Sequence, residues 1–327
     1  GEELVPEITS SGYDYVIWPG RMRSSKSGKL WGMFAQKELK YEMDRNPDAE
    51  PSLAEMTGKA IETLSEDPDG FFLMVEGSKI DWAAHANDPA GLVSDILAFD
   101  EAAEKALSFA KNNKDTVVII ASDHCTGGLT LADKTLNQAY EKTGPMTFIE
   151  PLKKAQRTGE GLFKLLHKDR SNLKQVMRES FGISDLKDWE EAYLIVSEPG
   201  SFNAAAGPII SSRMKIGWQT RGHTADDTTL YCYSPSGKRL SGVIDNTQIA
   251  LFIEDALGLS LSAASEKLFF PVSRLSAAFS SRTYGENTAN PVLLLENGGR
   301  TLEFPANKNY AFISGKKHKY IGLNILK

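Results

Sequence analysis

Three short segments of this chain carry side chains of the types that bind metal ions, and each segment adjoins a stretch whose pattern predicts a buried strand. The first segment, "EGSKIDWAAH", follows the apolar run "FFLMV", the second is the Asp-His pair after "TVVIIAS", and the third, "RGHT", precedes "TTLYCYS". In open α/β sheets, ligands gather at the carboxyl ends of the strands. The six candidate ligands are Glu76, Asp81, His85, Asp123, His124 and His223.

The spacing of these residues suits metal chemistry. Asp81 and His85 are four residues apart, so one helical turn places both on the same face. With His223 they make a set of two imidazoles and a carboxylate, the three-ligand pattern of a catalytic zinc with an open position. Asp123 and His124 can both face a metal from a strand-to-loop corner. Taken singly, each motif is more often structural, and it is their combination that favours a metal site.

The overall composition is that of a globular protein and excludes some functions. Of the 327 residues, 41% are hydrophobic and 24% are charged. The net charge of −6 gives no reason to expect nucleic-acid binding. No apolar stretch is long enough to span a bilayer, and the first residues lack a signal-peptide pattern. Cys125 and Cys232 form no CxxC pair, so we expect two buried free thiols. A single disulfide between them is the alternative that the sequence does not decide.

The first part of the chain alternates helical and strand patterns. Ser52 and Glu55 have capping-box spacing at the start of an amphipathic helix. Residues 71–75 and 116–122 are short apolar runs typical of strands buried on both faces, and apolar residues recur at helical spacing through 88–112 between them. Strand, helix and strand in this order predict a parallel βαβ unit.

The remaining segments complete the predicted architecture. Residues 132–215 are more polar, with helical pieces, and we interpret them as an insertion or cap at one end of the sheet. A strand at 228–234 and a helix at 246–259 follow. We expect an α/β fold over 1–262, a three-layer sandwich around a mostly parallel sheet. Residues 263–327 alternate short apolar runs with Asn-Gly-Gly and Ser-Gly-Lys turns, which predicts a separate small β-rich module.

The segments "GFFLMVEGSKIDWAAHAND", "VVIIASDHCTGGLTL" and "WQTRGHTADDTTLYCYSP" resemble three motifs of the alkaline phosphatases, in the same order, over roughly residues 1–262. The resemblance implies two zinc ions and a magnesium ion. It assigns one zinc to Asp81, His85 and His223, the second to Asp123 and His124, and the magnesium to Glu76. Trp82 stands where the family varies among Lys, His and Trp, a position that tunes the third metal and the binding of phosphate; alternatively, Trp82 packs against the loop.

The implied reaction is hydrolysis of phosphate monoesters through a phosphoserine, in an exported protein of the periplasm, cell envelope or extracellular space. However, the family's Asp-Ser-Ala nucleophile motif and its phosphate-binding arginine segment have no counterpart here, since the chain has no Asp-Ser dipeptide. We therefore expect the C-terminal part of a family member, truncated or processed and inactive alone, in which the second zinc and the magnesium bind poorly. Its expected partner is the missing N-terminal segment or the mate of a homodimer.

Three other interpretations stay open. The chain could be a metal-binding protein without catalysis, that is, a pseudoenzyme. It could be another hydrolase of the same superfamily, such as a sulfatase, phosphodiesterase or phosphomutase. Finally, the β-rich tail could dock the protein to a cell surface or to an envelope polymer.

Overall fold

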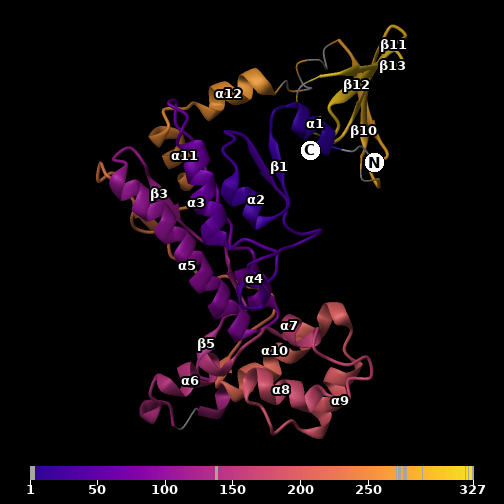
Figure 1. Cartoon of the computed structure of the whole chain (residues 1–327). Coiled ribbons are helices and arrows are strands. Elements are labelled where there is room, and N and C mark those ends of the chain that lie inside the picture. Colours follow the sequence, from indigo (N-terminus) through magenta and orange to yellow (C-terminus); the bar gives the residue numbers. More distant parts are fainter. Residues whose placement is uncertain are drawn as a thin grey trace. The chain divides into compact units, whose positions relative to one another are not determined.

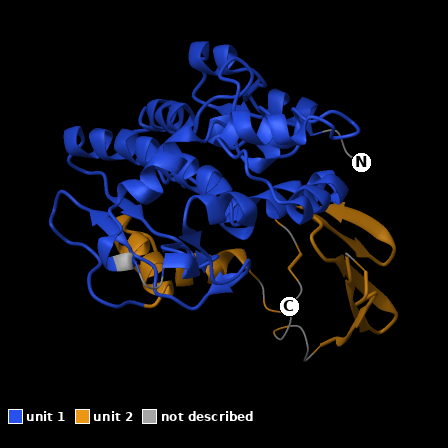
Figure 2. Ribbon diagram, turned by 90° about the horizontal axis from the view of Figure 1, so that it is seen from below, with its two compact units in different colours: residues 1–244 blue, residues 245–327 orange. Residues whose placement is uncertain are grey.

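The computed structural model describes residues 4–136, 139–269, 271, 274, 278–288, 290–320, 322 and 324–325. The chain divides into two compact units, residues 1–244 and 245–327, which Figure 2 colours separately. This division falls before the change of sequence pattern near residue 262, so the domain boundary placed there stays a prediction. Among the described residues, no helix combines the length and the apolar character that crossing a membrane requires.

The first unit begins with short elements that lead into a capped helix. They are α1 (Val5–Ser10), β1 (Asp14–Val16), α2 (Pro19–Ser24), β2 (Leu30–Gly32), the 3-10 helix η1 (Glu42–Asp44) and α3 (Leu53–Leu64). The predicted capping box of α3 is confirmed: the Ser52 hydroxyl accepts from the Glu55 amide at 3.1 Å, and the Glu55 carboxylate accepts from the Ser52 amide at 2.9 Å. β1 and β2 pair in parallel.

Two helices joined by a tight turn form the centre of the first unit. α4 (Lys79–His85) precedes α5 (Pro89–Asn112), which confirms the predicted long helix. Asp88 caps α5 by accepting hydrogen bonds from the amides of Ala90 and Gly91, both at 3.1 Å. α5 packs along α3 and α4, as Figure 1 shows. The cap and this packing therefore hold the start of α5 close to the end of α4, where the candidate ligand His85 lies.

The strand predicted at residues 71–75 is not formed, because this extended segment pairs with no other part of the described chain. It is not buried on both faces either: Phe72 is 61% exposed and Met74 is 74% exposed. The strand predicted at 116–122 is present as β3 (Val118–Ile120), and it pairs antiparallel with β8 (Tyr231–Tyr233). The predicted parallel sheet is thus not confirmed. A hydrophobic run indicates that a strand is buried, but it does not indicate which strand pairs with it or in which direction.

Short strands and helices connect β3 to β8 and confirm the helical pieces predicted within residues 132–215. They are β4 (Cys125–Thr126), β5 (Thr130–Leu131), η2 (Lys134–Leu136), η3 (Tyr140–Lys142), α6 (Met146–Lys154), α7 (Gly159–Phe163), α8 (Leu173–Phe181), α9 (Asp188–Val196), η4 (Pro199–Ser201), α10 (Phe202–Arg213), β6 (Ile216–Gly217) and β7 (His223–Thr224). The helices share one apolar core, in which Leu162, Met177, Leu194, Phe202 and Ile210 are fully buried.

The second unit ends in an antiparallel sheet, as the turn chemistry of the tail predicts. Its elements are α11 (Thr247–Ala256), α12 (Leu261–Leu268), β9 (Ser280–Tyr284), β10 (Val292–Asn297), β11 (Arg300–Pro305), β12 (Tyr310–Ile313) and β13 (Lys316–Lys319). The strand order is β13-β12-β11-β10-β9, so each strand pairs with its sequence neighbour. Gly298 and Gly299 join β10 to β11 with positive φ values of 54° and 80°, which side-chain-bearing residues rarely adopt. Parts of residues 263–327 lie outside the described residues.

Candidate metal site

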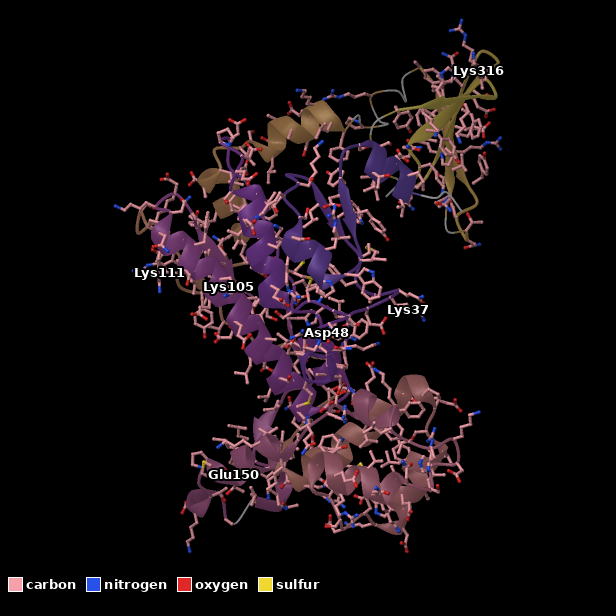
Figure 3. All side chains as sticks on the ribbon, in the orientation of Figure 1. Lys37, Asp48, Lys105, Lys111, Glu150 and Lys316 are labelled. Atoms are coloured by element: carbon pink, nitrogen blue, oxygen red, sulfur yellow. The ribbon has the colours of Figure 1, made fainter. Side chains whose placement is uncertain are left out.

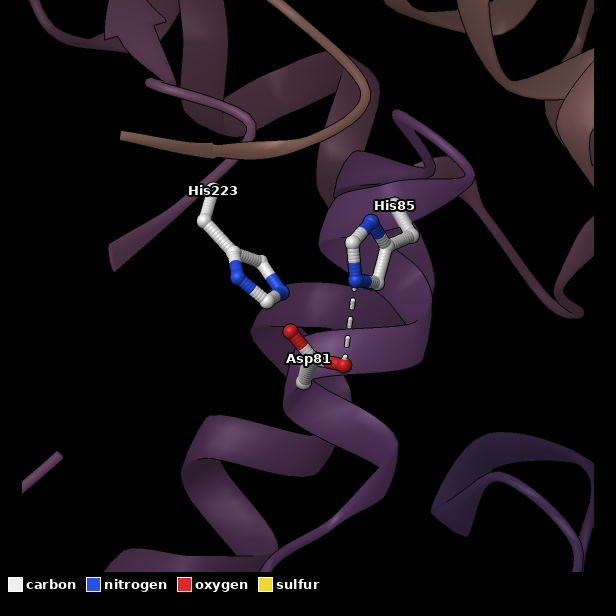
Figure 4. A group of neighbouring side chains, drawn as sticks. All are labelled: Asp81, His85 and His223. Carbon is white, nitrogen blue, oxygen red and sulfur yellow. Dashed lines mark ion pairs between the residues drawn. The ribbon is translucent and has the colours of Figure 1, made fainter. Parts of the chain in front are cut away.

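α4 supplies two of the candidate ligands from a single face. Asp81 lies in its first turn and His85 is its last residue, and the His85 Nε2 is 3.4 Å from the Asp81 Oδ2. Figure 4 shows the two side chains one above the other on the helix. This contact confirms that the four-residue spacing places both groups on one side. Both side chains are 38% exposed, so solvent reaches them.

The third ligand arrives from a distant segment through a short strand pair. β4 and β7 pair antiparallel with Thr126 opposite His223. The approach of this pair to α4 requires a glycine at Gly127, which has a φ of 80°. A Cβ there would lie 2.7 Å from the Trp218 ring and 3.0 Å from the Ala84 carbonyl oxygen. The Gly127 amide also donates to the Gly222 carbonyl at 2.9 Å, which holds the residue before His223 in place.

Asp81, His85 and His223 converge on one point, with one candidate ligand atom from each lying within 4.8 Å of the others. The imidazole rings of His85 and His223 have centroids 5.2 Å apart. In Figure 4 the His223 ring faces the other two side chains from across a small gap. Two imidazole nitrogens and a carboxylate oxygen in this arrangement are a donor set that suits zinc.

Hydrogen bonds fix the orientation of the ligands on α4. The His85 Nδ1 contacts the Arg221 carbonyl oxygen, which can only accept, so Nδ1 carries a hydrogen and Nε2, on the side of Asp81, is the ring nitrogen available to a metal ion. Thr126 donates from Oγ1 to the Asp81 Oδ1 at 2.7 Å. Metal-binding histidines commonly donate their second ring nitrogen to a carbonyl or carboxylate in this way. Thus neighbouring groups set the orientation of both candidate ligands.

His124 and Asp123 lie beside the first three ligands. The His124 ring stacks on the His223 ring with centroids 3.7 Å apart. Its Nδ1 is 3.2 Å from the Thr126 hydroxyl oxygen; because that hydroxyl donates to Asp81, it accepts from His124. The His124 Nε2 is then the ring nitrogen available to a metal ion, and it lies 3.2 Å from the Asp123 Oδ2. The side chain of Asp123 is 84% exposed and open to solvent.

Glu76 and Trp82 stand apart from this group. Glu76 is exposed, and among the described residues it does not join the cluster of candidate ligands. The indole of Trp82 is 46% exposed, and the Lys79 Nζ lies 3.9 Å from its ring centroid on one side. Lys79 is itself buried, and its ammonium is also 4.7 Å from the centroid of the Tyr41 ring. Trp82 therefore both packs against the chain and presents surface to solvent.

A helix from residues 132–215 supports the end of α4. α10 approaches the turn after His85 so closely that a Cβ on Gly207 would lie 2.1 Å from the Ala86 carbonyl oxygen. Asn87 has a φ of 51° in this turn, and its carbonyl oxygen accepts a hydrogen bond from the Ser211 hydroxyl at 2.8 Å. The Trp218 indole donates to the same hydroxyl at 2.8 Å. α10 is therefore part of the scaffold of the candidate site.

Both cysteines are free thiols, as their spacing predicts, but they are half-buried rather than buried. Cys125 lies in β4, opposite Thr224 of β7. Cys232 lies in β8, opposite Ile119 of β3. They belong to different strand pairs and contribute to no disulfide.

Sequence reasoning missed the groups that orient the ligands. Thr126 contacts both Asp81 and His124, but one threonine after an Asp-His-Cys run carries no distinguishing pattern. The Arg221 carbonyl is a backbone group, so its role depends only on where the chain passes. The glycine pair at residues 127–128 was the available signal, since paired glycines mark a close backbone approach.

The first unit gathers two imidazoles and a carboxylate at one solvent-open point, which places the chain among proteins with a candidate metal centre. The comparisons with known proteins then identify the family. The sequence model described as alkaline phosphatase matches residues 1–259, and the chain belongs to the alkaline phosphatase family. The resemblance seen in the three sequence motifs is thereby confirmed.

Relatives with established names span several organisms. Alkaline phosphatase 3 of Bacillus subtilis (strain 168) is 36% identical over 262 residues, which cover 78% of this chain and 54% of that protein. Repressible alkaline phosphatase of Saccharomyces cerevisiae is 32% identical over 301 residues, covering 81% of this chain and 53% of that protein. The chain thus spans about half the length of the curated relatives that it matches.

Solved structures share the α/β fold. The alkaline phosphatase of Thermus thermophilus superimposes with a TM-score of 0.70 and 29% identity, covering 79% of this chain and 59% of that one. A cold-active alkaline phosphatase from Shewanella gives a TM-score of 0.67 with 27% identity, covering 79% of this chain and 62% of that one. The α/β assignment of the first unit is therefore confirmed.

Proposed function

We propose that this chain forms the metal-binding part of a phosphomonoesterase, with Asp81, His85 and His223 holding a zinc ion. The observation that carries the proposal is the convergence of these three side chains from α4 and β7, in a chain of the alkaline phosphatase family. When bound there, zinc supplies a Lewis acid for an oxygen of a phosphate monoester. The protein's part is to hold the three donor atoms and to leave one side open to substrate.

The donor set fits zinc in type and in arrangement. Imidazole nitrogen and carboxylate oxygen are both common zinc ligands, and three protein ligands leave the fourth position for water or substrate. The His85 Nε2 and the Asp81 carboxylate are already oriented by the Arg221 carbonyl and by Thr126. Such support reduces the reorganisation that binding requires.

We extend the proposal to the residues beside this site. Asp123 and His124 would hold a second zinc, since the His124 Nε2 and the Asp123 carboxylate lie 3.2 Å apart beside the first site. Glu76 would serve a magnesium ion, and Trp82 would tune the hold on phosphate. Because Glu76 lies outside the cluster and Asp123 is highly exposed, we expect the second zinc and the magnesium to bind more weakly than the first zinc.

In the proposed reaction, the groups that attack and clamp the phosphate lie outside this chain. A serine nucleophile and the phosphate-binding arginine would come from a polypeptide segment that is not in these 327 residues. Two observations support this view: the chain spans about half the length of its relatives, and Phe72 and Met74 are exposed on a segment that pairs with no strand of the described chain. Such an uncovered apolar segment favours pairing with another strand. The complete protein would act on phosphate monoesters as an exported enzyme.

The experiment is a hydrolysis assay with p-nitrophenyl phosphate in buffer with zinc and magnesium. We expect no turnover by the chain alone, and turnover when it is co-expressed with the polypeptide encoded directly upstream of its first codon. p-Nitrophenyl sulfate and bis(p-nitrophenyl) phosphate test the sulfatase and phosphodiesterase alternatives in the same format. Turnover by the chain alone would overturn the claim that the nucleophile is missing. Zinc binding with no turnover in the co-expressed complex would instead favour a non-catalytic metal protein.

A further inference from the structure

The last strand of the β sheet carries an unusual concentration of positive charge. β13 consists of Lys316, Lys317, His318 and Lys319, and all four side chains are exposed. No ion pair is recorded for these lysines within the described residues, and residues 306–320 include no aspartate or glutamate. This segment contrasts with the chain as a whole, whose net charge is −6. The positive charge of β13 is therefore local, and no ion pair within the described part of the chain neutralises it.

The strand register places these charges on both faces of the sheet edge. Lys317 lies opposite Phe312 and Lys319 opposite Tyr310, so both project from one face. Residues two apart on a strand are about 6.6 Å apart along its axis. Lys316 and His318 project from the other face, and Figure 3 shows Lys316 at the end of the sheet. β13 thus forms a narrow positive rim rather than a flat positive surface.

The carboxylates of the sheet are engaged elsewhere. Glu303 in β11 accepts a hydrogen bond from the Tyr284 hydroxyl at 2.9 Å. Glu296 in β10 is 3.8 Å from the Arg282 guanidinium. Both contacts point toward β9, at the opposite edge from β13. A negatively charged ligand along β13 would consequently meet cations and no competing carboxylate from this hairpin.

β13 also offers backbone donors. It is the terminal strand of the sheet order, so its outer edge pairs with no strand among the described residues. An edge strand presents a row of free N–H and C=O groups, and backbone N–H groups together with lysines are regular partners of phosphate oxygens. Lysines on an edge strand can serve simply to prevent pairing with other sheets. That role does not require lysines on both faces of the strand.

We propose that β13 and the adjoining β12–β13 turn bind a linear phosphate-bearing polymer that runs along the sheet edge. A thin polyanion can reach cations on both faces of one strand, whereas a flat bilayer reaches one face. Stacked bases are a poor fit, because Tyr310 and Phe312 are half-buried and Lys317 already covers the Tyr310 ring, with its Nζ 3.9 Å from the centroid. The inference does not depend on the metal site.

The test measures binding of the full chain to immobilised poly(glycerol phosphate) in low-salt buffer with EDTA, so that metal-held phosphate makes no contribution. The parallel probes are a single-stranded oligonucleotide of matched charge and vesicles of phosphatidylcholine with phosphatidylglycerol. We expect the chain to bind poly(glycerol phosphate) more tightly than the oligonucleotide or the vesicles. This binding should weaken as the salt concentration increases. No binding, or tighter binding to the oligonucleotide or the vesicles, would overturn the proposal.

Variants locate the binding edge. Replacing Lys316, Lys317 and Lys319 by Gln should weaken binding by about fivefold for each lysine removed. The matched control replaces Lys37, Lys105 and Lys111, three exposed lysines of the first unit that Figure 3 labels, and should bind like the original chain. Replacing the β13 lysines by Arg keeps the charge and should preserve binding, which separates loss of charge from loss of folding. Equal losses in the β13 and control Gln variants would contradict the assignment to β13.

Discussion

The imidazole rings of His124 and His223 are stacked, with centroids 3.7 Å apart and ring planes inclined by 23°. His223 lies in β7 and His124 immediately precedes β4; these two strands are distant in sequence and pair through Thr126 and His223. This stack connects the proposed first and second zinc sites. A change that disturbs the β4–β7 pair should therefore affect both groups of ligands.

A substitution at Thr126 tests how strongly the β4–β7 pair supports zinc binding at the proposed first site. Thr126→Val removes the hydroxyl that donates to Asp81 and accepts from His124, while it retains the shape and the β propensity of the residue. We expect zinc affinity to fall by about tenfold or more, as is typical when a group that orients a ligand is lost. Competition with a fluorescent zinc chelator measures the change. Thr130→Val, in the neighbouring β5, is the control, and an equal loss there would contradict the role of Thr126.

Gly207 tests the support that α10 gives to α4. Gly207→Ala places a Cβ 2.1 Å from the Ala86 carbonyl oxygen, one residue after His85, so the helix or the turn must shift. We expect the free energy of unfolding to fall by about 2 kcal/mol, the usual size of overpacking penalties, and zinc affinity to fall with it. Urea titration measures the former. Gly200→Ala is the control, because nothing lies within 4 Å of its added Cβ; equal stability of the two variants would refute the contact.

Much of the fold could be predicted from local pattern. The Ser52–Glu55 capping box and the periodicity of α5 are short-range features, and both elements appear where they were expected. The strand predicted at residues 71–75 was wrong. Apolar side chains favour burial, but whether a segment is buried and paired depends on which other segments lie beside it. The antiparallel pairing of β3 with β8 likewise depends on contacts between distant segments.

In the candidate site, too, local sequence pattern predicts only the contacts between residues that are close in sequence. The i, i+4 spacing of Asp81 and His85 determines that both share a helix face, so their proximity could be predicted. His223 could be suggested only from its place beside a strand, because its approach depends on the β4–β7 pairing. The roles of Thr126 and of the Arg221 carbonyl could not be predicted, since both arise from tertiary position alone.

Asp95 makes the stability of the first unit depend on pH. Burial raises the pKa of this carboxyl from 3.8 to about 7, although the Glu42 amide donates to it at 3.2 Å. A raised pKa in the folded state means that its contribution to stability is full below about pH 4 and is lost as the pH rises toward 7. Asp95→Asn should therefore raise the free energy of unfolding at pH 8 by about 1–2 kcal/mol, with a smaller gain at pH 5.

Urea titrations at the two pH values check this expectation. Asp48→Asn replaces an exposed aspartate, labelled in Figure 3, and should change stability little at either pH. A gain from Asp95→Asn that does not depend on pH would argue against a buried, titrating carboxyl at position 95.

Ser52 tests the cap that fixes the start of α3. Ser52→Ala removes the acceptor for the Glu55 amide and leaves that N–H without its partner. The expected loss in the free energy of unfolding is about 1 kcal/mol. Ser65→Ala, at the other end of the same helix, removes only a 3.3 Å bond to the Glu62 carbonyl and should cost less. Chemical denaturation followed by circular dichroism compares the two, and a larger loss from Ser65→Ala would contradict the capping role.

The central claim is that Asp81, His85 and His223 form a zinc site within this chain, and metal analysis tests it most directly. After exposure to zinc and exhaustive dialysis, mass-spectrometric metal analysis should find about one tightly held zinc per chain, the occupancy of a three-ligand site. Asp81→Asn and His223→Ala should each abolish it, while His167→Ala, at an exposed histidine of the helical insertion, should retain it. Markedly less than one zinc in the original chain, or unchanged zinc in the Asp81 and His223 variants, would contradict the account.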